Sequence, residues 1–112
     1  MRQIHENIVP TQAAATVTTA AIPALNLFYA SAQISGGGGA GGTLIMQASL
    51  DYSEVANFVP TNWSAIPNAT ITVTGNGSFL IPKTDLCYQY VRLVYTNTGT
   101  GTISIVFKGL GE

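Results

Sequence analysis

The stretch TDLCYQYVRLVYTNTGTGTISIVFKGLGE, from Thr84 to Glu112, decides the fold class of this chain. It contains two runs, Cys87–Thr96 and Thr102–Lys108, that are rich in β-branched and aromatic residues and alternate as β-strands do. Asn, Thr and Gly lie between the runs and suit a turn. The stretch therefore predicts a C-terminal β-hairpin against which the earlier strands pack.

The first of these runs has no purely polar face. One face carries Cys87, Gln89, Val91, Leu93 and Tyr95, and the other carries Tyr88, Tyr90, Arg92, Val94 and Thr96. Such a strand is typical of the middle of a sheet. We expect a second sheet to cover one face and a neighbouring subunit to cover the other, with Cys87 as a buried thiol.

Shorter β-type runs fill the rest of the chain. They are Ala14–Ile22, Leu25–Ser35, Thr43–Ser49, Thr70–Thr74 and Ser78–Ile81. With turn signals between them and no convincing helix, the pattern predicts an all-β chain. The expected fold is a single antiparallel β-sandwich over residues 1–112, jelly-roll-like, with about seven to eight short strands. Residues 1–12 are read as an N-terminal arm or an edge strand, because Pro10 suits a sheet edge.

The glycine run Gly36–Gly42 (GGGGAGG) is read as a long hairpin loop between the flanking strands. A phosphate-binding loop would need a Lys and a following helix, and the next residues read as a strand. In the same way Gly75–Gly77 is read as a tight turn that pairs Thr70–Thr74 with Ser78–Ile81.

Charge is scarce throughout the chain. Only 8% of residues are charged and the net charge is −1, whereas an average soluble domain is roughly 25% charged. Four scattered basic residues (Arg2, Lys83, Arg92 and Lys108) are too few to neutralise a nucleic-acid backbone, so no nucleic-acid partner is expected. Polar residues interrupt the apolar run Ala13–Ala32, so no membrane span is expected either. A surface with so little charge is typical of one covered in a homo-oligomer.

The side chains that could do chemistry are few and spread out. His5 is the only histidine, and Asp51 and Glu54 form the only close acidic pair. We predict no catalytic residue, no cofactor and no metal, with two alternatives left open. One is a Ca²⁺ site at Asp51 and Glu54, and the other is an enzyme that uses those carboxylates with His5, or a reactive Cys87.

Four motifs occur in order from Gly42 onward: GTLIMQASLDYS, NWSAIP, TVTGNGSFL and YQYVRLVYTNTGTGTISIVFKGLG. In this order they resemble small β-sandwich accessory proteins of tailed bacteriophage virions, of the head-decoration, head-fibre or tail-associated kind. The resemblance covers about the last 70 residues, and its motifs specify the sandwich more than the role. Gln89 stands where the family commonly has a basic residue, and the loop Tyr52–Thr61 is longer than the family suggests.

The resemblance implies a non-enzymatic viral structural protein, made in the host cytoplasm and found in the virion. It would form a trimer or another closed homo-oligomer and bind phage capsid or tail proteins. The alternative is a carbohydrate-binding or host-adhesion module that binds a host-surface glycan through exposed aromatic residues. The residues expected at the interface or glycan contact are Trp63, Tyr88, Tyr90 and Arg92.

Overall fold

A computed structural model describes residues 3–111, which form nine β-strands in two antiparallel sheets and contain no helix. Consequently these residues include no helix long and apolar enough to cross a membrane. The strands are β1 (Gln3–Ala13), β2 (Val17–Thr18), β3 (Ile22–Pro23), β4 (Leu27–Gly37), β5 (Gly42–Ser49), β6 (Ser64–Val73), β7 (Gly77–Asp85), β8 (Tyr90–Asn97) and β9 (Thr102–Gly111).

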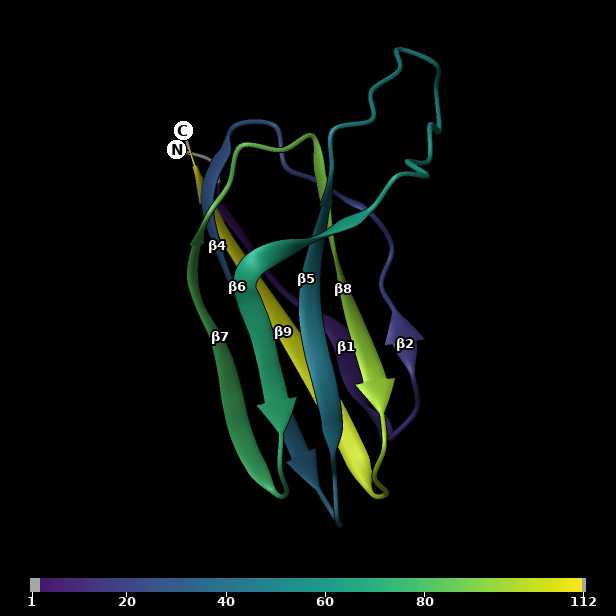
Figure 1. The fold of residues 1–112 in the computed structure, drawn as a ribbon, viewed down its shortest axis with the longest axis vertical. Coiled ribbons are helices and arrows are strands. Elements are labelled where there is room, and N and C mark those ends of the chain that lie inside the picture. The colour runs from purple at the N-terminus through teal and green to yellow at the C-terminus, as the bar shows by residue number, and fades with distance from the viewer. Residues whose placement is uncertain (1–2, 112) are drawn as a thin grey trace.

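The strand order is that of a jelly roll. Sheet A runs β1-β9-β4-β7, and sheet B runs β2-β8-β5-β6, with β3 also pairing with β8. Laid over each other, the two orders set β1 against β2, β9 against β8, β4 against β5, and β7 against β6 (Figure 1). Two sheets joined in this way by successive crossings are the jelly-roll arrangement. The predicted fold class is therefore confirmed.

The three predicted hairpins are wrong, because the strands of each pair lie in different sheets. β8 belongs to sheet B and β9 to sheet A, and the same split separates β4 from β5 and β6 from β7. Each turn passes from one sheet to the other at one end of the sandwich, the lower end in Figure 1. Alternation shows which side of a strand is buried, but a hairpin and a crossing between sheets give the same alternation.

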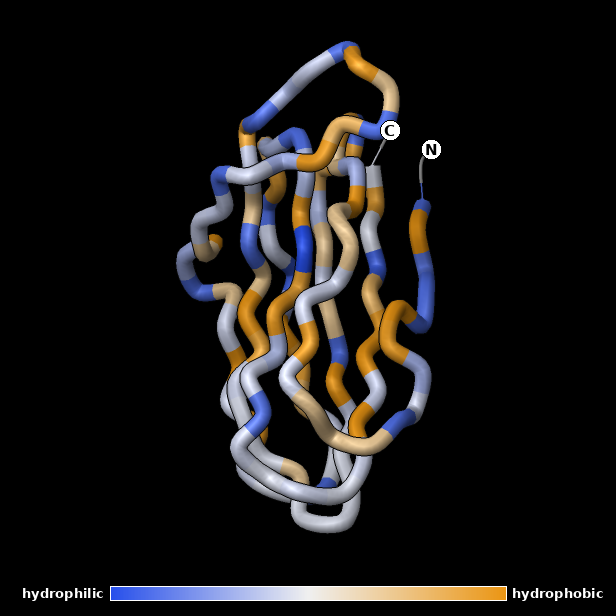
Figure 2. Tube along the Cα trace, turned by 90° about the vertical axis from the view of Figure 1, so that its right-hand side faces the viewer, coloured by the Kyte–Doolittle hydropathy of each residue, from blue (hydrophilic) through white to orange (hydrophobic). Residues whose placement is uncertain are grey.

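Close packing between these crossings accounts for the glycine run. The Thr98 and Thr100 amides donate to the Gly41 and Gly39 carbonyls at 3.0 Å each, joining the β8–β9 and β4–β5 turns. Gly42 has φ +151°, and a Cβ there would lie 2.2 Å from the Thr96 carbonyl oxygen. Only glycine fits that approach. This end of the sandwich has almost neutral hydropathy (Figure 2).

The core lies between the inner faces of the two sheets. Ile34, Ile105 and Phe107 of sheet A face Leu44, Met46, Val91, Leu93 and Tyr95 of sheet B, and each is 0% exposed. Their spacing of two within each strand is the expected alternation of a sandwich. The Tyr95 hydroxyl donates to the Gly41 carbonyl at 2.6 Å, so it is satisfied inside the core.

Local irregularities explain where the alternation fails. β8 begins at Tyr90, so Cys87 lies in the preceding loop and its thiol is exposed, contrary to the prediction. A register shift between Leu27 and Tyr29 turns both Leu27 and Ala30 inward, where simple alternation places them on opposite faces. In β6, Asn68 has φ +64° and shifts the buried side chains by one residue.

The N-terminal segment is an edge strand. β1 pairs antiparallel with β9 from Gln3↔Leu110 to Ala13↔Thr102, with two register shifts near Val9. Such shifts, together with Pro10, disfavour pairing of a free edge with other chains. Met1 and Arg2, the start of the predicted arm or edge strand, lie outside the described residues, as does Glu112. The predicted strand Ala14–Ile22 contributes only β2 and the first residue of β3.

Candidate functional site

Residues 50–63 form a long loop that joins β5 to β6 within sheet B and projects beyond the sandwich (Figure 1). Asp51 holds the two ends of the loop together. One carboxylate oxygen, Oδ2, accepts hydrogen bonds from the Thr61 and Asn62 backbone amides at 2.9 Å each. The Asn62 side-chain amide donates to Oδ1 at 3.1 Å. The loop therefore leaves the sheet from a neck held by hydrogen bonds.

These donors stabilise the charged form of Asp51. The Asn62 and Thr61 backbone amides, and then the Asn62 side chain, lower the pKa of this carboxyl from its ordinary value of 3.8. The carboxylate therefore keeps its charge, and the neck its hydrogen bonds, from neutral pH down into the acid range. Asp51, which the sequence analysis considered as a calcium ligand, has a structural role here.

The loop carries apolar side chains that no part of the described chain covers. Leu50, Tyr52, Val55 and Val59 are 71%, 62%, 71% and 70% exposed. They account for half of the large hydrophobic residues found exposed in residues 3–111. Large exposed apolar residues gathered on one segment are a feature of surfaces that contact other molecules. We call residues 50–63 the projecting loop.

An arginine–aromatic stack lies on the outer face of sheet B at the base of the projecting loop. Arg92 of β8 pairs directly with Gln47 of β5, and its Nε donates to the Gln47 Oε1 at 2.8 Å. The guanidinium carbon lies 4.4 Å from the centroid of the Trp63 ring. The Trp63 indole N–H donates to the Pro60 carbonyl at 3.2 Å. The stacking contributes about 0.5–1 kcal/mol at a partly exposed position.

Tyr90 extends this aromatic surface. Its ring centroid is 6.2 Å from that of Phe58, at an interplanar angle of 50°. That is a favourable tilted arrangement for two aromatic rings. Tyr90, Arg92 and Trp63 are all partly exposed. We call Phe58, Trp63, Tyr90 and Arg92 the aromatic platform.

Three of the four predicted contact residues thus come together, and the fourth does not. Tyr88 precedes β8, packs against the edge of the hydrophobic core, and lines a hollow of about 390 Å³ with Ile66 at the neck of the projecting loop. Tyr88 lies outside the aromatic platform because it precedes β8, which begins at Tyr90. The alternation of side chains along β8 therefore does not place Tyr88 on the same face as Tyr90 and Arg92.

The remaining chemical candidates are dispersed. His5 pairs with Lys108 on β1 and β9 of sheet A, whereas Asp51 and Glu54 belong to the projecting loop of sheet B. Among residues 3–111, no three His, Cys, Asp or Glu side chains gather as a metal site would require. Cys87 is an exposed single thiol.

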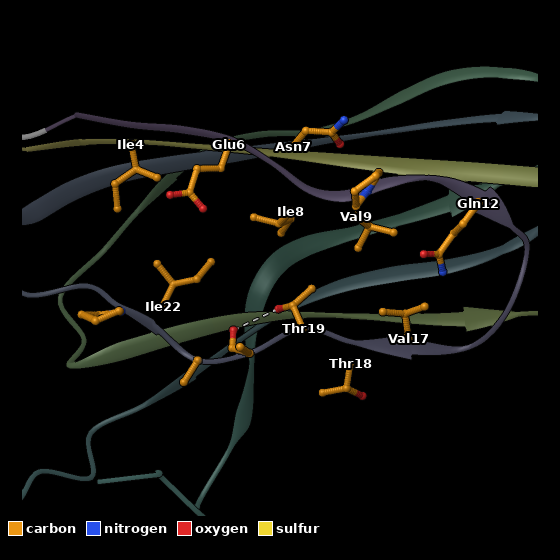
Figure 3. Close-up of a pocket in the computed structure, with 14 residues that line it drawn as sticks. Ile4, Glu6, Asn7, Ile8, Val9, Gln12, Val17, Thr18, Thr19 and Ile22 are labelled. Atoms are coloured by element: carbon orange, nitrogen blue, oxygen red, sulfur yellow. Dashed lines mark hydrogen bonds between the residues drawn. The ribbon is translucent and has the colours of Figure 1, made fainter. Parts of the chain in front are cut away.

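A groove opens between β1 and β2 at one side of the sandwich. β6 and β7 lie in contact on the opposite side, whereas β1 and β2 stay further apart. The groove between them has a volume of about 900 Å³. Ile4, Ile8 and Glu6 point from β1 toward Ile22 on the facing strand (Figure 3). We call it the β1–β2 groove.

Sequence reasoning missed Gln47, the role of Asp51 and the β1–β2 groove. The pairing of Gln47 with Arg92 depends on the register of β5 and β8, and the sequence carries no signal for it. The groove had a weak signal in the apolar residues Ile4 and Ile8, which belong to the segment read as an arm or edge strand.

Comparison with known proteins leaves the family open. No family model matches the chain, and no curated protein matches it either. Among solved structures, a protein from Bacillus endospore appendages, described as a novel family of disulfide-linked pili, aligns with a TM-score of 0.44 and 15% sequence identity. That alignment covers 98% of this chain and 89% of the other. A likeness this distant carries no argument about function.

Proposed function

We propose that this chain is a non-enzymatic structural protein of a bacteriophage virion, a capsid decoration, head-fibre or tail accessory protein that forms a homo-oligomer on the virion surface. The projecting loop is the observation that carries the proposal. Its four exposed apolar side chains, on a neck held by Asp51, are suited to contact with another protein.

Two further observations support the same role. The motifs from Gly42 onward resemble phage virion accessory proteins in their order. The jelly roll, here with the order β1-β9-β4-β7 and β2-β8-β5-β6, is a recurrent fold of viral capsid domains. Fold alone does not specify function, so the loop has to be tested directly.

Sedimentation with purified phage particles tests the proposal. The purified protein is mixed with particles of a tailed phage that lack it, and the pellet is assayed for bound chain. We expect saturable binding that Val55→Asp abolishes and Leu80→Asp leaves intact, because Leu80 is a similarly exposed apolar residue on β7, away from the loop. The proposal would be contradicted if the wild-type protein bound neither heads nor tails, or if Val55→Asp and Leu80→Asp bound equally well.

The aromatic platform supports a second candidate, a carbohydrate-binding or host-adhesion module. Trp63 and Tyr90 remain partly exposed on the outer face of sheet B, where a sugar ring could stack on them. A glycan array followed by titration of Trp63 fluorescence tests this. Saturable quenching by one glycan, lost in Tyr90→Ala, would favour this module, and a blank array would exclude it for the glycans tested.

A further inference from the structure

We infer that the aromatic platform binds a sugar ring that carries a carboxylate, and that Arg92 is the residue that recognises the acid group. The inference rests on the second candidate function, in which this platform binds a glycan, and it names the class of sugar. It is carried by Arg92, a cation that is held in place and has no counter-ion in the described chain.

Two contacts hold the Arg92 guanidinium. Its Nε donates to the Gln47 Oε1 at 2.8 Å, and its central carbon lies 4.4 Å from the centroid of the Trp63 ring. The Trp63 indole N–H donates to the Pro60 carbonyl at 3.2 Å, which orients that ring in turn. An arginine that is ordered before a ligand arrives loses less conformational entropy when the ligand binds.

Neither contact neutralises this cation. Gln47 is an uncharged amide, and within residues 3–111 no carboxylate forms an ion pair with Arg92. Asp51, at the neck of the projecting loop, accepts instead from the Thr61 and Asn62 amides. The two terminal nitrogens of Arg92 therefore have no hydrogen-bond partner in the part of the chain that the structure describes. A guanidinium edge of this kind matches the two oxygens of a carboxylate.

Tyr90 supplies the surface for the sugar ring. Tyr90 and Arg92 lie two residues apart on β8 and share the outer face of sheet B, since Val91 between them is buried. Two such residues are about 6.6 Å apart along a strand, a distance that one six-membered sugar ring and its carboxylate span. The Tyr90 ring packs against Phe58 with centroids 6.2 Å apart, so its position is also set before binding.

The surrounding charge favours a ligand with a single negative charge. Arg92 is the one charged residue on the strands of sheet B, so this face cannot neutralise a polyanion such as a nucleic acid. Asp51 and Glu54 on the neighbouring loop would repel additional negative charges. One carboxylate on one sugar ring therefore matches the platform in both charge and size.

Calorimetric titration of the purified protein with two sugars tests the inference. The methyl glycosides of glucuronic acid and glucose differ only in a carboxylate that replaces a CH2OH group. We expect the acid to bind at least about tenfold more tightly, because only the acid accepts the paired, charge-assisted hydrogen bonds of Arg92. Added salt should weaken binding of the acid. The methyl glycoside of N-acetylneuraminic acid, whose carboxylate is on a different ring carbon, shows which kind of acidic sugar binds more tightly.

Three variants assign this preference to Arg92. Arg92→Gln should remove the preference for the acid. Gln47→Glu should remove it as well, because it places a carboxylate beside the arginine and supplies the missing counter-ion. Lys83→Gln is the matched control and should keep the preference, because the Lys83 Nζ also lies over an aromatic ring, 4.2 Å from the Tyr29 centroid, but on sheet A. Thermal unfolding checks that each variant folds.

The inference would be overturned if the two sugars bound equally well, if Arg92→Gln kept the preference for the acid, or if acetate or an acidic peptide bound as tightly as the acidic sugar. Equal binding of both sugars that is lost in Tyr90→Ala would leave the glycan-binding candidate standing without an acid requirement. If no sugar bound, the inference would fail together with that candidate for these sugars. Sedimentation with phage particles would still decide the virion role independently.

Discussion

Replacing Tyr95 by Phe removes a single hydroxyl from the middle of the core and should weaken the fold by a measurable amount. The ring is 0% exposed and stays in place, so the apolar burial is unchanged. What is lost is the hydrogen bond of 2.6 Å from the hydroxyl to the Gly41 carbonyl, together with the longer contact of 3.3 Å to the Asn97 Oδ1. That bond ties β8 to the crossing between β4 and β5.

The geometry sets the magnitude of the loss. A buried acceptor left with no partner costs about 1–3 kcal/mol. The Gly41 carbonyl keeps a second donor, the Thr98 amide at 3.0 Å, so the lower end applies. We expect Tyr95→Phe to reduce the free energy of unfolding by about 1 kcal/mol, which corresponds to a fall in Tm of about 4 °C for a domain of this size.

Urea unfolding followed by circular dichroism measures this difference. Tyr90→Phe is the matched control, because the Tyr90 hydroxyl makes no hydrogen bond in the described structure, and its effect should stay below about 0.5 kcal/mol. If Tyr95→Phe changed stability no more than Tyr90→Phe, the hydroxyl would not hold the crossing and the reasoning would be refuted.

Alkaline pH provides an independent test of the same residue. Burial raises the pKa of Tyr95 above its ordinary value of 10.0, because the interior disfavours the phenolate. Above pH 10.0 the unfolded chain therefore loses this proton before the folded chain does, and stability falls as pH rises. Tyr95→Phe lacks this proton, so the stability gap between wild type and variant should narrow above pH 10.0. A constant gap would contradict the assignment.

Three other predictions concern the turns, the loop and the thiol. Gly42→Ala should lower the free energy of unfolding in urea by about 3–5 kcal/mol, because its Cβ meets the backbone of β8. Gly75→Ala, with φ +153° and open space around it, should lower it by only about 1 kcal/mol. Equal losses of stability in the two variants would be inconsistent with the clash at Gly42. Asp51→Asn should lower the hydrogen-exchange protection of the Asn62 amide, measured against the intrinsic rate at the same pH. Acid should lower this protection in the wild type as pH falls below 3.8 through the lowered pKa of Asp51. Unchanged protection would show that the neck does not depend on this carboxylate. Cys87 should react with a maleimide in the folded protein as fast as in urea, and protection in the folded state would contradict its exposure.

The fold class, and the buried face of strands with clear alternation such as β8, could be predicted from the sequence. Val91, Leu93 and Tyr95 alternate in the sequence and are all buried, because a period of two places them on one side of the pleat. Cys87 was misplaced because that alternation was extended past the start of β8. Periodicity describes a strand and does not state where it begins.

The sequence did not predict which strands pair with each other in the two sheets. Thr70–Thr74 and Ser78–Ile81 are joined by Gly-Asn-Gly, which fits a tight hairpin, yet they lie in opposite sheets. Ser78–Ile81 pairs with β4, far earlier in the chain, and Thr70–Thr74 pairs with β5, the strand before it, so the turn between the two strands chooses neither partner. The candidate site follows the same rule: Trp63 and Arg92 were named individually, and their contact arises from the register of β8 on β5 together with the path of the loop.

The position of β9 has a consequence for how the protein is made. This last strand lies between β1 and β4, so it joins the first strand of the chain to the rest of sheet A. While the ribosome still holds residues 102–111, β1 has no partner and β4 has only β7. Sheet A therefore cannot be complete until residues 102–111 are free to pair, and β1 stays unpaired until then. Folding that waits for such distant contacts is slow, and a chain that stops before Thr102 should be insoluble.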